Sequence, residues 1–579
     1  MRYPAPRRPF GSGRFQQIAA RRNFWQRSGM TGIRHSPDRP RRSPPLRPRR
    51  LACCLLWLAA SPVFAAPAPP PPATPLEQAD YAALPDNEAV LAYLDRLASA
   101  YSNARRIQLG QSADGRPIGG LLVSGNPDFL ETAAFRSGME NPRLRAMLVA
   151  GQHGDETATT EALQVIAREL LVGDLADLPD SMDLILVPAA SPDGRDLRRR
   201  TNGAGENVNT DYILLTQPES QALSAALTRF RPDTVMDIHE SSAYKEDTLA
   251  RQGYVTFFDI QYEVGFEPNI DRRLRRYGVD VFLPALIQRA AARKLNARRY
   301  ILEIRDVNEP VTHGGITLRN FRNYSGSSNA LSTLVEGRID PPGDYPTPDN
   351  IRERTEELAG AIAAYLRQVH AMREPIKQRV QAAREQWQGP VDDGGLALKS
   401  EFALDPEQPR IRIPLREIDS GAVIEKPFDY HGRVVTLETF RPPAGYLVTA
   451  HQDRVAELLK RHGVIVDRLD QPVALPGRRR TIRNLEVTPP PPERRRYTLA
   501  LQVDSEPATV TGAPGDLFID LAQPDGRRVP LLLEPLSTTS IYQEPGYTEM
   551  LETDPFYLVP VDRAPADQKG SAEGVLPAQ

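Results

Sequence analysis

Four polar positions follow or end short apolar runs of this sequence, and together they are typical of a metal-dependent hydrolase. His153 and Glu156 come directly after "AMLVAG", His239 ends "TVMDIH", and Glu336 ends "LSTLVE". Two histidines and one glutamate leave a fourth position on zinc for water, as in catalytic rather than structural sites. A second carboxylate is then needed as a general base, and an arginine would stabilise the negative charge that develops on a carbonyl oxygen.

The spacing of His153 and Glu156 does not by itself identify a metal site. His35 also has a carboxylate three residues later, at Asp38, in an arginine-rich leader where no site is expected. The other features have structural interpretations as well, such as a surface ion pair between Glu336 and its near neighbour Arg338. The metal-site hypothesis therefore depends on these features meeting at one edge of one sheet.

The segments around these positions alternate between strands and helices. The runs "AMLVAG", "DLILVPA", "TVMDIH" and "LSTLVEG" are typical of buried strands, and apolar residues at helical spacing follow the first of them. Two more strands are predicted on either side of an Asp-Gly turn in "RIQLGQSADGRPIGGLLVSG". This alternation predicts an α/β fold with helices on both sides of a central sheet. Ligands of such sheets bind outside the carboxyl ends of the strands.

Composition divides the chain into five segments. Residues 1–66 contain 14 arginines, no lysine and one acid, and they end in an apolar run at 51–60 followed by "SPVFAAPA". This pattern predicts a signal peptide with a long basic n-region. Translation from Met30 would shorten that n-region. The remaining segments are a proline-rich linker (67–78), the α/β domain (79–372), a helical connector (373–395) and a smaller β-rich C-terminal domain (396–579).

Charge and cysteine content narrow the partners that we expect. Without residues 1–66 the chain carries a formal net charge of about −15, which disfavours nucleic acids and anionic membrane surfaces as partners. The apolar run of the leader is too short for a permanent membrane anchor. Both cysteines, Cys53 and Cys54, lie in the leader, so histidines and carboxylates must hold any metal. We expect a secreted protein, periplasmic in a Gram-negative-type cell, and leave its oligomeric state open.

Taken in order, these motifs resemble the M14 family of zinc carboxypeptidases over about residues 79–372. "GQSADGRPI" is similar to the family's G-x-S-x-(E/D)-G-R segment, "HGDE" to its H-x-x-E zinc motif, and "SPDG" to its N-P-D-G. "RTN" is similar to its R-x-N, and "RNFRNYSGSSNALSTLVEGR" to the segment that precedes its catalytic glutamate. The resemblance implies a mixed central sheet and one Zn²⁺ per chain, bound by His153, Glu156 and His239.

The resemblance also implies roles for the other candidates. Glu336 takes the place of the general base, and Arg200 that of the arginine that stabilises the oxyanion, with Arg199 as the alternative. Asn209 matches a substrate-binding asparagine of the family. Tyr324 matches its mobile substrate-binding tyrosine, although the spacing to Glu336 is short.

One position departs from the family pattern. The family's D-L-N-R-N-F is "NVNTDY" here, so Asn209 is kept, but Thr210 replaces the arginine that grips the terminal carboxylate of the substrate. Threonine cannot form that bidentate pair. Either Arg322 or Arg319 replaces it, or the substrate has no free α-carboxylate there.

These observations favour a zinc metallopeptidase of carboxypeptidase type that acts on a peptide or peptide-like substrate. A zinc-dependent deacylase or peptidoglycan amidase is the alternative with the same chemistry. A catalytically silent binding protein with the same fold is the alternative from another functional class, and the retained candidate residues argue against it.

Overall fold

The computed structural model of this chain describes residues 71–134, 143–340, 350–387, 395–490, 496–554 and 556–565. The predicted signal peptide, the start of the linker and part of the helical connector lie outside the described residues. Residues 69–579 form one compact unit. Within the described ranges, no helix combines the length and the apolar character needed to cross a bilayer.

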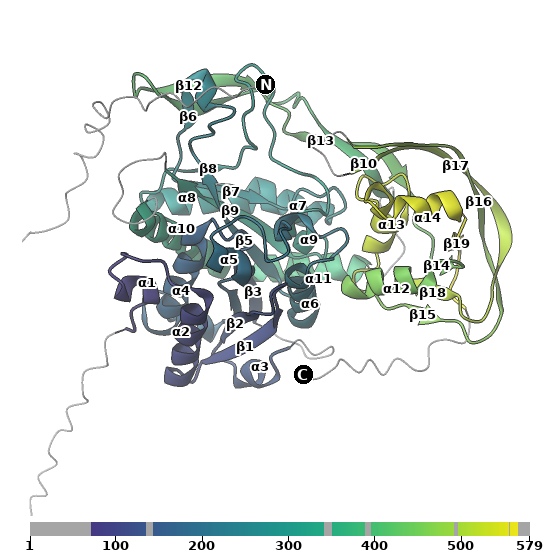
Figure 1. Cartoon of the computed structure of the whole chain (residues 1–579), viewed down its shortest axis with the longest axis horizontal. Coiled ribbons are helices and arrows are strands. Elements are labelled where there is room, and N and C mark those ends of the chain that lie inside the picture. The colour runs from purple at the N-terminus through teal and green to yellow at the C-terminus, as the bar shows by residue number, and fades with distance from the viewer. Residues whose placement is uncertain are drawn as a thin grey trace, which may run out of the picture. The chain divides into compact units, whose positions relative to one another are not determined.

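An eight-stranded sheet with the order β1-β2-β4-β3-β5-β9-β7-β8 forms the centre of the α/β part (Figure 1). Its strands are β1 (Ala104–Gln111), β2 (Pro117–Val123), β3 (Leu144–Ala150), β4 (Met182–Val187), β5 (Thr234–Ser242), β7 (Ile260–Val264), β8 (Ala297–Arg299) and β9 (Leu331–Ile339). Strands β4, β3, β5 and β9 run parallel to one another, and so do β7 and β8. The pairs β1–β2, β2–β4 and β7–β9 are antiparallel. The predicted mixed central sheet is therefore confirmed.

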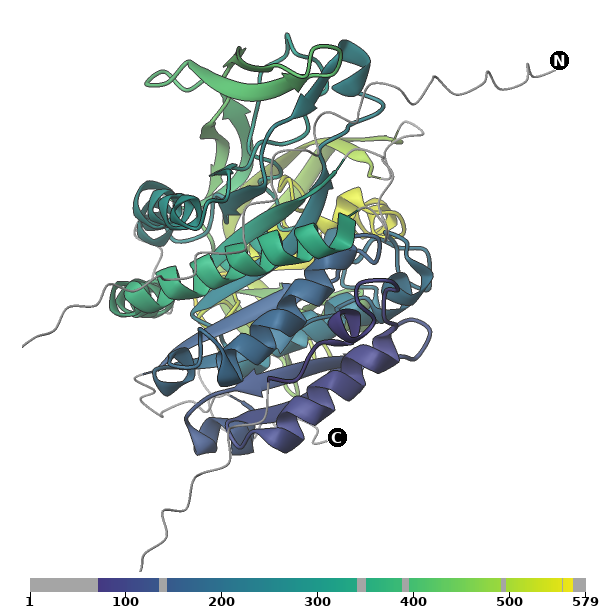
Figure 2. The ribbon, with the colours of Figure 1, turned by 90° about the vertical axis from the view of Figure 1, so that its left-hand side faces the viewer.

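Helices cover both faces of this sheet (Figure 2). The first face carries α2 (Asn87–Ala100), α4 (Thr157–Val172), α8 (Leu283–Ala292) and α10 (Ile351–Ala371), and the second α3 (Pro127–Thr132), α6 (Pro218–Phe230) and α9 (Phe321–Gly326). Successive residues of β3 alternate between the two faces: Ala146 and Leu148 pack with the first set of helices, and Met147 and Val149 pack with the second. Burial on both faces explains why "AMLVAG" is a continuous apolar run.

Four more α-helices lie in this part of the chain. They are α1 (Pro75–Gln78), α5 (Pro192–Leu197), α7 (Arg272–Tyr277) and α11 (Arg373–Trp387). Helix α5 begins in the "SPDG" motif, and Asp193 of this motif accepts hydrogen bonds from Ser112 Oγ (2.7 Å), Asp114 N (2.9 Å) and Arg116 Nη1 (2.6 Å). Two motifs of the sequence thus contact each other directly.

The C-terminal segment is rich in strands, as predicted. Its strands are β10 (Leu396–Ala403), β11 (Arg410–Glu417), β12 (Val423–Asp429), β13 (Arg433–Phe440), β14 (Gly445–Val448), β15 (Asp467–Arg468), β16 (Val473–Thr488), β17 (Thr498–Gly512), β18 (Leu517–Asp520) and β19 (Leu558–Val561). Its helices are α12 (Gln452–Arg461), α13 (Arg528–Leu533) and α14 (Thr548–Thr553). Strands β14 to β19 form a six-stranded sheet, and β10 pairs with β13.

Two of the contacts between the C-terminal segment and the α/β part lie near the site residues. Strand β11 pairs with β6 (Tyr254–Thr256), so that β12, β11 and β6 form a three-stranded sheet. Arg528 of α13 is buried against α9, where it donates hydrogen bonds to the hydroxyl (3.1 Å) and the carbonyl oxygen (3.2 Å) of Tyr324. Both contacts join segments that are more than 150 residues apart in the sequence.

Candidate active site

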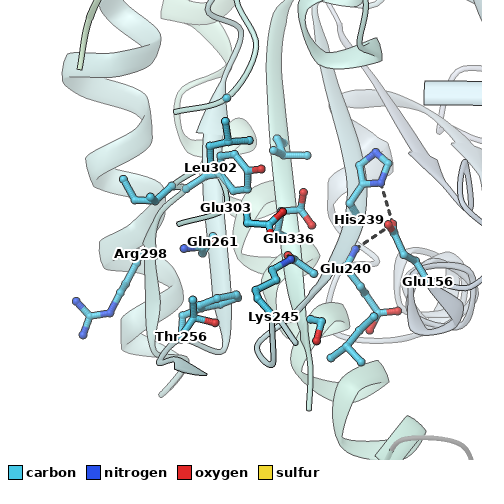
Figure 3. A pocket seen from close by; sticks show the side chains of 18 of the residues that line it. Glu156, His239, Glu240, Lys245, Thr256, Gln261, Arg298, Leu302, Glu303 and Glu336 are labelled. Carbon is cyan, nitrogen blue, oxygen red and sulfur yellow. Dashed lines mark hydrogen bonds and ion pairs between the residues drawn. The ribbon is translucent and has the colours of Figure 1, made fainter. Parts of the chain in front are cut away.

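The three predicted metal ligands lie together at one edge of the central sheet. His153 and Glu156 follow β3, His239 lies in the neighbouring β5, and their ligand atoms are all within 4.8 Å of one another. Nδ1 of His153 is 2.7 Å from Oε1 of Glu156, and Nδ1 of His239 is 2.8 Å from Oε2 (Figure 3). Both imidazoles therefore direct the same ring nitrogen toward one carboxylate.

The outward-facing ring nitrogens of the two histidines also have partners. Nε2 of His153 is 3.0 Å from Oδ1 of Asn207, and Nε2 of His239 is 2.8 Å from Oδ1 of Asp237. Gln152 donates to the same Asp237 oxygen at 2.6 Å. Histidines that bind a metal commonly donate their second N–H to such an oxygen, which fixes the ring and its tautomer. The residues present thus fit a zinc ion held by Nδ1, Nδ1 and a carboxylate oxygen.

The electrostatics of this group also fit a cation. Burial alone would raise the pKa of Glu156, but the charges of His153 and His239 hold it well below its usual value. Burial would likewise lower the pKa of His239, yet Asp237 and Glu156 raise it well above its usual value. The buried carboxylates therefore stabilise positive charge at the point where the ligand atoms meet.

Close packing of two loops positions the first two ligands. A Cβ on Gly154 would lie 1.9 Å from the carbonyl carbon of Gly194, so no side chain fits between His153 and Glu156 at this point. The N–H of Gly154 also donates to the carbonyl oxygen of Arg199 at 3.0 Å. The "HGDE" loop is thereby fixed against the loop that carries the candidate oxyanion arginine.

Glu336 lies beside His239 on the adjacent strand. The two residues are paired in the parallel register of β5 and β9, and both line the same cleft. Burial raises the pKa of Glu336 to about 7. The strands do not end at these residues, as the sequence suggested, but continue to Ser242 and Ile339, because the two strands remain paired there.

Of Arg199 and Arg200, it is Arg200 that lines the cleft. Its Nη1 donates to Oε1 of Glu156 at 3.0 Å, while about half of the side chain stays exposed. Arg199 instead donates to the carbonyl oxygens of Asn202 (2.6 Å) and Gly203 (3.0 Å). Of the two arginines that the sequence left open, Arg200 is therefore placed to contact a substrate.

The cleft has a volume of about 650 Å³ and continues past Glu336 to a second group of residues. In Figure 3, Glu336 lies between the metal-ligand group and the side chains of Gln261 and Thr256. Arg322 lines the cleft and is only 3% exposed. Its Nε and Nη1 have no hydrogen-bond partner among the described residues, and its Nη2 has a long contact of 3.4 Å with the carbonyl oxygen of Gly315. A buried guanidinium with unused donors is a ready site for an anion.

The other residues considered for carboxylate binding are placed differently. Arg319 has Nη1 3.6 Å from Oε1 of Glu544 and does not line the cleft. Thr210 is exposed, and its Oγ1 donates to the carbonyl oxygen of Asn207 at 3.1 Å. Asn209 does line the cleft, but it is also a structural residue, since its Oδ1 accepts the N–H of Phe321 at 2.9 Å.

The structure does not support the prediction for Tyr324. This tyrosine is fully buried and does not line the cleft. Its hydroxyl contacts Ser224 Oγ (2.7 Å), Nη1 of Arg528 (3.1 Å) and Nδ1 of His462 (3.2 Å). It has this position because the C-terminal segment packs over α9, which the sequence motif could not indicate. Tyr324 therefore joins two parts of the fold and is not placed to move toward a substrate.

Several residues of the site were missed from the sequence. Asp237 precedes His239 by two positions and so shares its face of the strand, which is a signal that could have been used. Asn207 lies two positions before Asn209, where a short 3-10 helix begins. Tyr300 lines the cleft from the end of β8, and Ile413 lines it from β11. No local pattern marks these last two residues, because only the tertiary fold brings them to the cleft.

Comparison with known proteins gives a partial match. The family model described as zinc carboxypeptidase, Peptidase M14, matches residues 90–213. A probable carboxypeptidase 2 of Arthroderma benhamiae is 24% identical over 218 residues, which is 36% of this chain and 41% of the fungal protein. Carboxypeptidase D of Homo sapiens is 31% identical over 130 residues, 20% of this chain and 9% of that protein. The chain thus spans less than half the length of these relatives.

Two solved structures are also similar. A metallo-carboxypeptidase from Burkholderia cenocepacia has 19% sequence identity and a TM-score of 0.38, with 50% of this chain and 69% of the other covered. A metallo-carboxypeptidase from Pseudomonas aeruginosa, in complex with (2-guanidinoethylmercapto)succinic acid, has 20% identity and a TM-score of 0.38, with the same coverage.

The segment that matches the family model contains four of the candidate residues. They are His153, Glu156, Arg200 and Asn209. His239 and Glu336 lie beyond the matched segment, and the parallel pairing of β3, β5 and β9 brings them to the same edge of the sheet. Over residues 90–213 and the motifs in them, this chain is therefore similar to the M14 family of zinc carboxypeptidases.

Proposed function

We propose that this protein is a zinc-dependent metallopeptidase of carboxypeptidase type, which hydrolyses a peptide bond near the C-terminus of its substrate. The observation that carries the proposal is the convergence of two imidazole Nδ1 atoms on the carboxylate of Glu156, with a buried acid, Glu336, on the adjacent strand. The match of residues 90–213 to the zinc carboxypeptidase family model supports the same chemistry.

Glu336 and Arg200 each have a separate role in this reaction. When bound, zinc supplies a Lewis acid that polarises the substrate carbonyl and lowers the pKa of a water molecule. Glu336 accepts the proton of the attacking water and then delivers it to the leaving amine. Burial raises the pKa of this carboxyl, which makes it a stronger base than an exposed glutamate. Arg200 donates to the oxygen on which negative charge develops.

Arg322 is the residue that we assign to the terminal carboxylate of the substrate. Its two unused guanidinium nitrogens are buried, and the residue lines the same cleft as Glu336 and the metal ligands. A carboxylate could accept from both nitrogens, which supplies the bidentate pairing that Thr210 cannot make. This assignment keeps the chemistry of an exopeptidase without the arginine that the family usually has after Asn209.

The leader supports a location for this activity outside the cytoplasm. Residues 1–66 have the composition of a signal peptide, so we propose that the enzyme is secreted, and periplasmic in a Gram-negative-type cell. Cell fractionation with antibody detection tests this. Recovery of the unprocessed chain from the cytoplasm alone would contradict it.

Paired peptides test the proposed reaction. Zinc-loaded protein is incubated with peptides that are identical except for a free or amidated C-terminus, beside acyl-amino-acid and muropeptide substrates, and the products are measured by mass spectrometry. We expect release of one C-terminal residue from the free acid only. Equal cleavage of both forms would favour a broader amide hydrolase, and no cleavage with zinc bound would favour a silent binding protein.

A further inference from the structure

The hairpin of β11 and β12 brings the C-terminal segment to the cleft. Strand β11 pairs with β6 through Leu415 and Thr256, Arg416 and Val255, and Glu417 and Tyr254. Ile413 and Pro414, which precede Leu415 in β11, line the cleft. Phe257 and Phe258, which directly follow β6, line it as well. The cleft therefore has a wall that lies outside the segment matched by the family model.

An apolar cluster fixes this hairpin in place. Leu415 and Phe428 of the hairpin are buried against Leu249, Ile304 and Val311 of the α/β part. Next to Leu415, the guanidinium of the half-buried Arg416 lies over the ring of Phe257, 4.9 Å from its centroid. The position of the wall is thus set by packing and does not depend on a flexible tip.

Hydrogen bonds join the base of the hairpin to the loop that follows Tyr300. The N–H of Val311 donates to the carbonyl oxygen of Asp429, and the N–H of His431 donates to that of Val311, both at 3.0 Å. The Tyr430 hydroxyl contacts Nε2 of His313, whose Nδ1 lies 2.7 Å from the carbonyl oxygen of Tyr300. The hairpin and Tyr300 are therefore positioned together.

The cleft has a group of apolar side chains besides its charged ones. Phe257, Phe258, Ile301, Ile413 and Pro414 add apolar surface to a lining that also includes Lys245, Arg298 and Glu303. Apolar walls bind apolar side chains through the surface that both remove from water. A substrate side chain that contacts Ile413 and its apolar neighbours should therefore be apolar.

We propose that the β11–β12 hairpin is a wall that selects the substrate, and that Ile413 contacts an apolar substrate side chain. The inference deepens the proposed function and rests on it, because it assigns a substrate preference to the same cleft. Ile411 provides a matched control. It lies two residues earlier on the same face of β11 and packs against the same cluster, but it does not line the cleft.

Binding tests the wall without requiring turnover. Zinc-loaded Glu336→Gln protein is titrated by calorimetry with Ala-Ala-Ala and with the three tripeptides that carry one phenylalanine, which also locates the subsite. We expect at least one phenylalanine peptide to bind tighter than Ala-Ala-Ala. Ile413→Ala should reduce that preference by about tenfold, and Ile413→Glu should abolish it. Ile411→Ala should leave the preference unchanged.

The outcomes separate this inference from the proposed function. Equal loss of preference in Ile411→Ala and Ile413→Ala would show that the hairpin only supports the fold, and would overturn the wall. Unchanged preference in Ile413→Ala would overturn it as well. If wild-type protein cleaves none of these peptides while Ile413 still governs their binding, the proposed hydrolysis fails and the wall stands.

Discussion

Two groups of side chains in the cleft, the metal ligands (the metal end) and Arg322 (the open end), differ in how their polar atoms are satisfied. At the metal end, each histidine directs Nδ1 toward Glu156, and its Nε2 has an oxygen partner, Asn207 or Asp237. Arg322 lines the same cleft and is just as buried, but its Nε and Nη1 have no partner among the described residues. A closed network holds its own geometry before any substrate arrives. The unpartnered N–H groups of Arg322 can instead donate to a substrate. The metal ligands are therefore suited to catalysis, and Arg322 is suited to substrate recognition.

Removing a ligand from the metal end should have the largest effect. His153→Ala should lose most of the bound zinc and nearly all activity, because two donors cannot replace three in a tetrahedral site. Metal content by mass spectrometry, at about one equivalent in the wild type, measures the change. His370→Ala, on α10 and outside the cleft, is the control. Full zinc occupancy in His153→Ala would show that the ligands are wrongly assigned.

Glu336→Gln should separate catalysis from metal binding at the same end. Turnover should fall by about 10²–10⁴-fold, the usual contribution of a general base, while zinc content stays unchanged. Glu303→Gln is a matched control, since this residue lines the cleft but accepts a hydrogen bond from Thr248 Oγ1. Activity within tenfold of the wild type in Glu336→Gln would reject its role.

Substitution of Arg322 tests the open end. Arg322→Ala should raise KM for free-acid peptides by about 10- to 100-fold, the equivalent of about 1.5–3 kcal/mol for a charged hydrogen-bonded pair. Amidated peptides should be affected much less. Arg319→Ala, whose guanidinium faces Glu544, should resemble the wild type. A strong free-acid preference that survives both substitutions would remove the distinction between the two ends.

Tyr324→Phe should have the smallest effect on kinetics. Loss of the hydroxyl removes a buried partner from Ser224, Arg528 and His462, so the free energy of unfolding should fall by about 1–2 kcal/mol. Chemical denaturation measures this change. KM and kcat should stay within about a factor of two of the wild type. A large rise in KM with unchanged stability would restore Tyr324 as a substrate-binding residue.

The contrast between the two ends also explains what the sequence could predict. The metal ligands and Glu336 lie on or just after strands whose apolar runs are visible in the sequence. Because these strands are parallel, their carboxyl-terminal parts lie side by side. His153, Glu156, His239 and Glu336 could be placed by that rule. Tyr324 could not, because its surroundings come from α12 and α13, far along the chain. The position of the β11–β12 hairpin beside the cleft could not be predicted either, because no local sequence pattern indicates it.

The pairing of β6 with β11 has a consequence for any attempt to shorten the chain. Strand β6 has only three residues, and it is the edge strand of a sheet in which β11 is its neighbour. Truncation of the chain near residue 395 would remove β11, the pairing partner of β6. The backbone donors and acceptors of β6 would then be free to pair with other chains. The same cut would uncover the apolar side chains around Leu249 and Ile304. A truncated enzyme should therefore aggregate before its catalytic residues can be assayed.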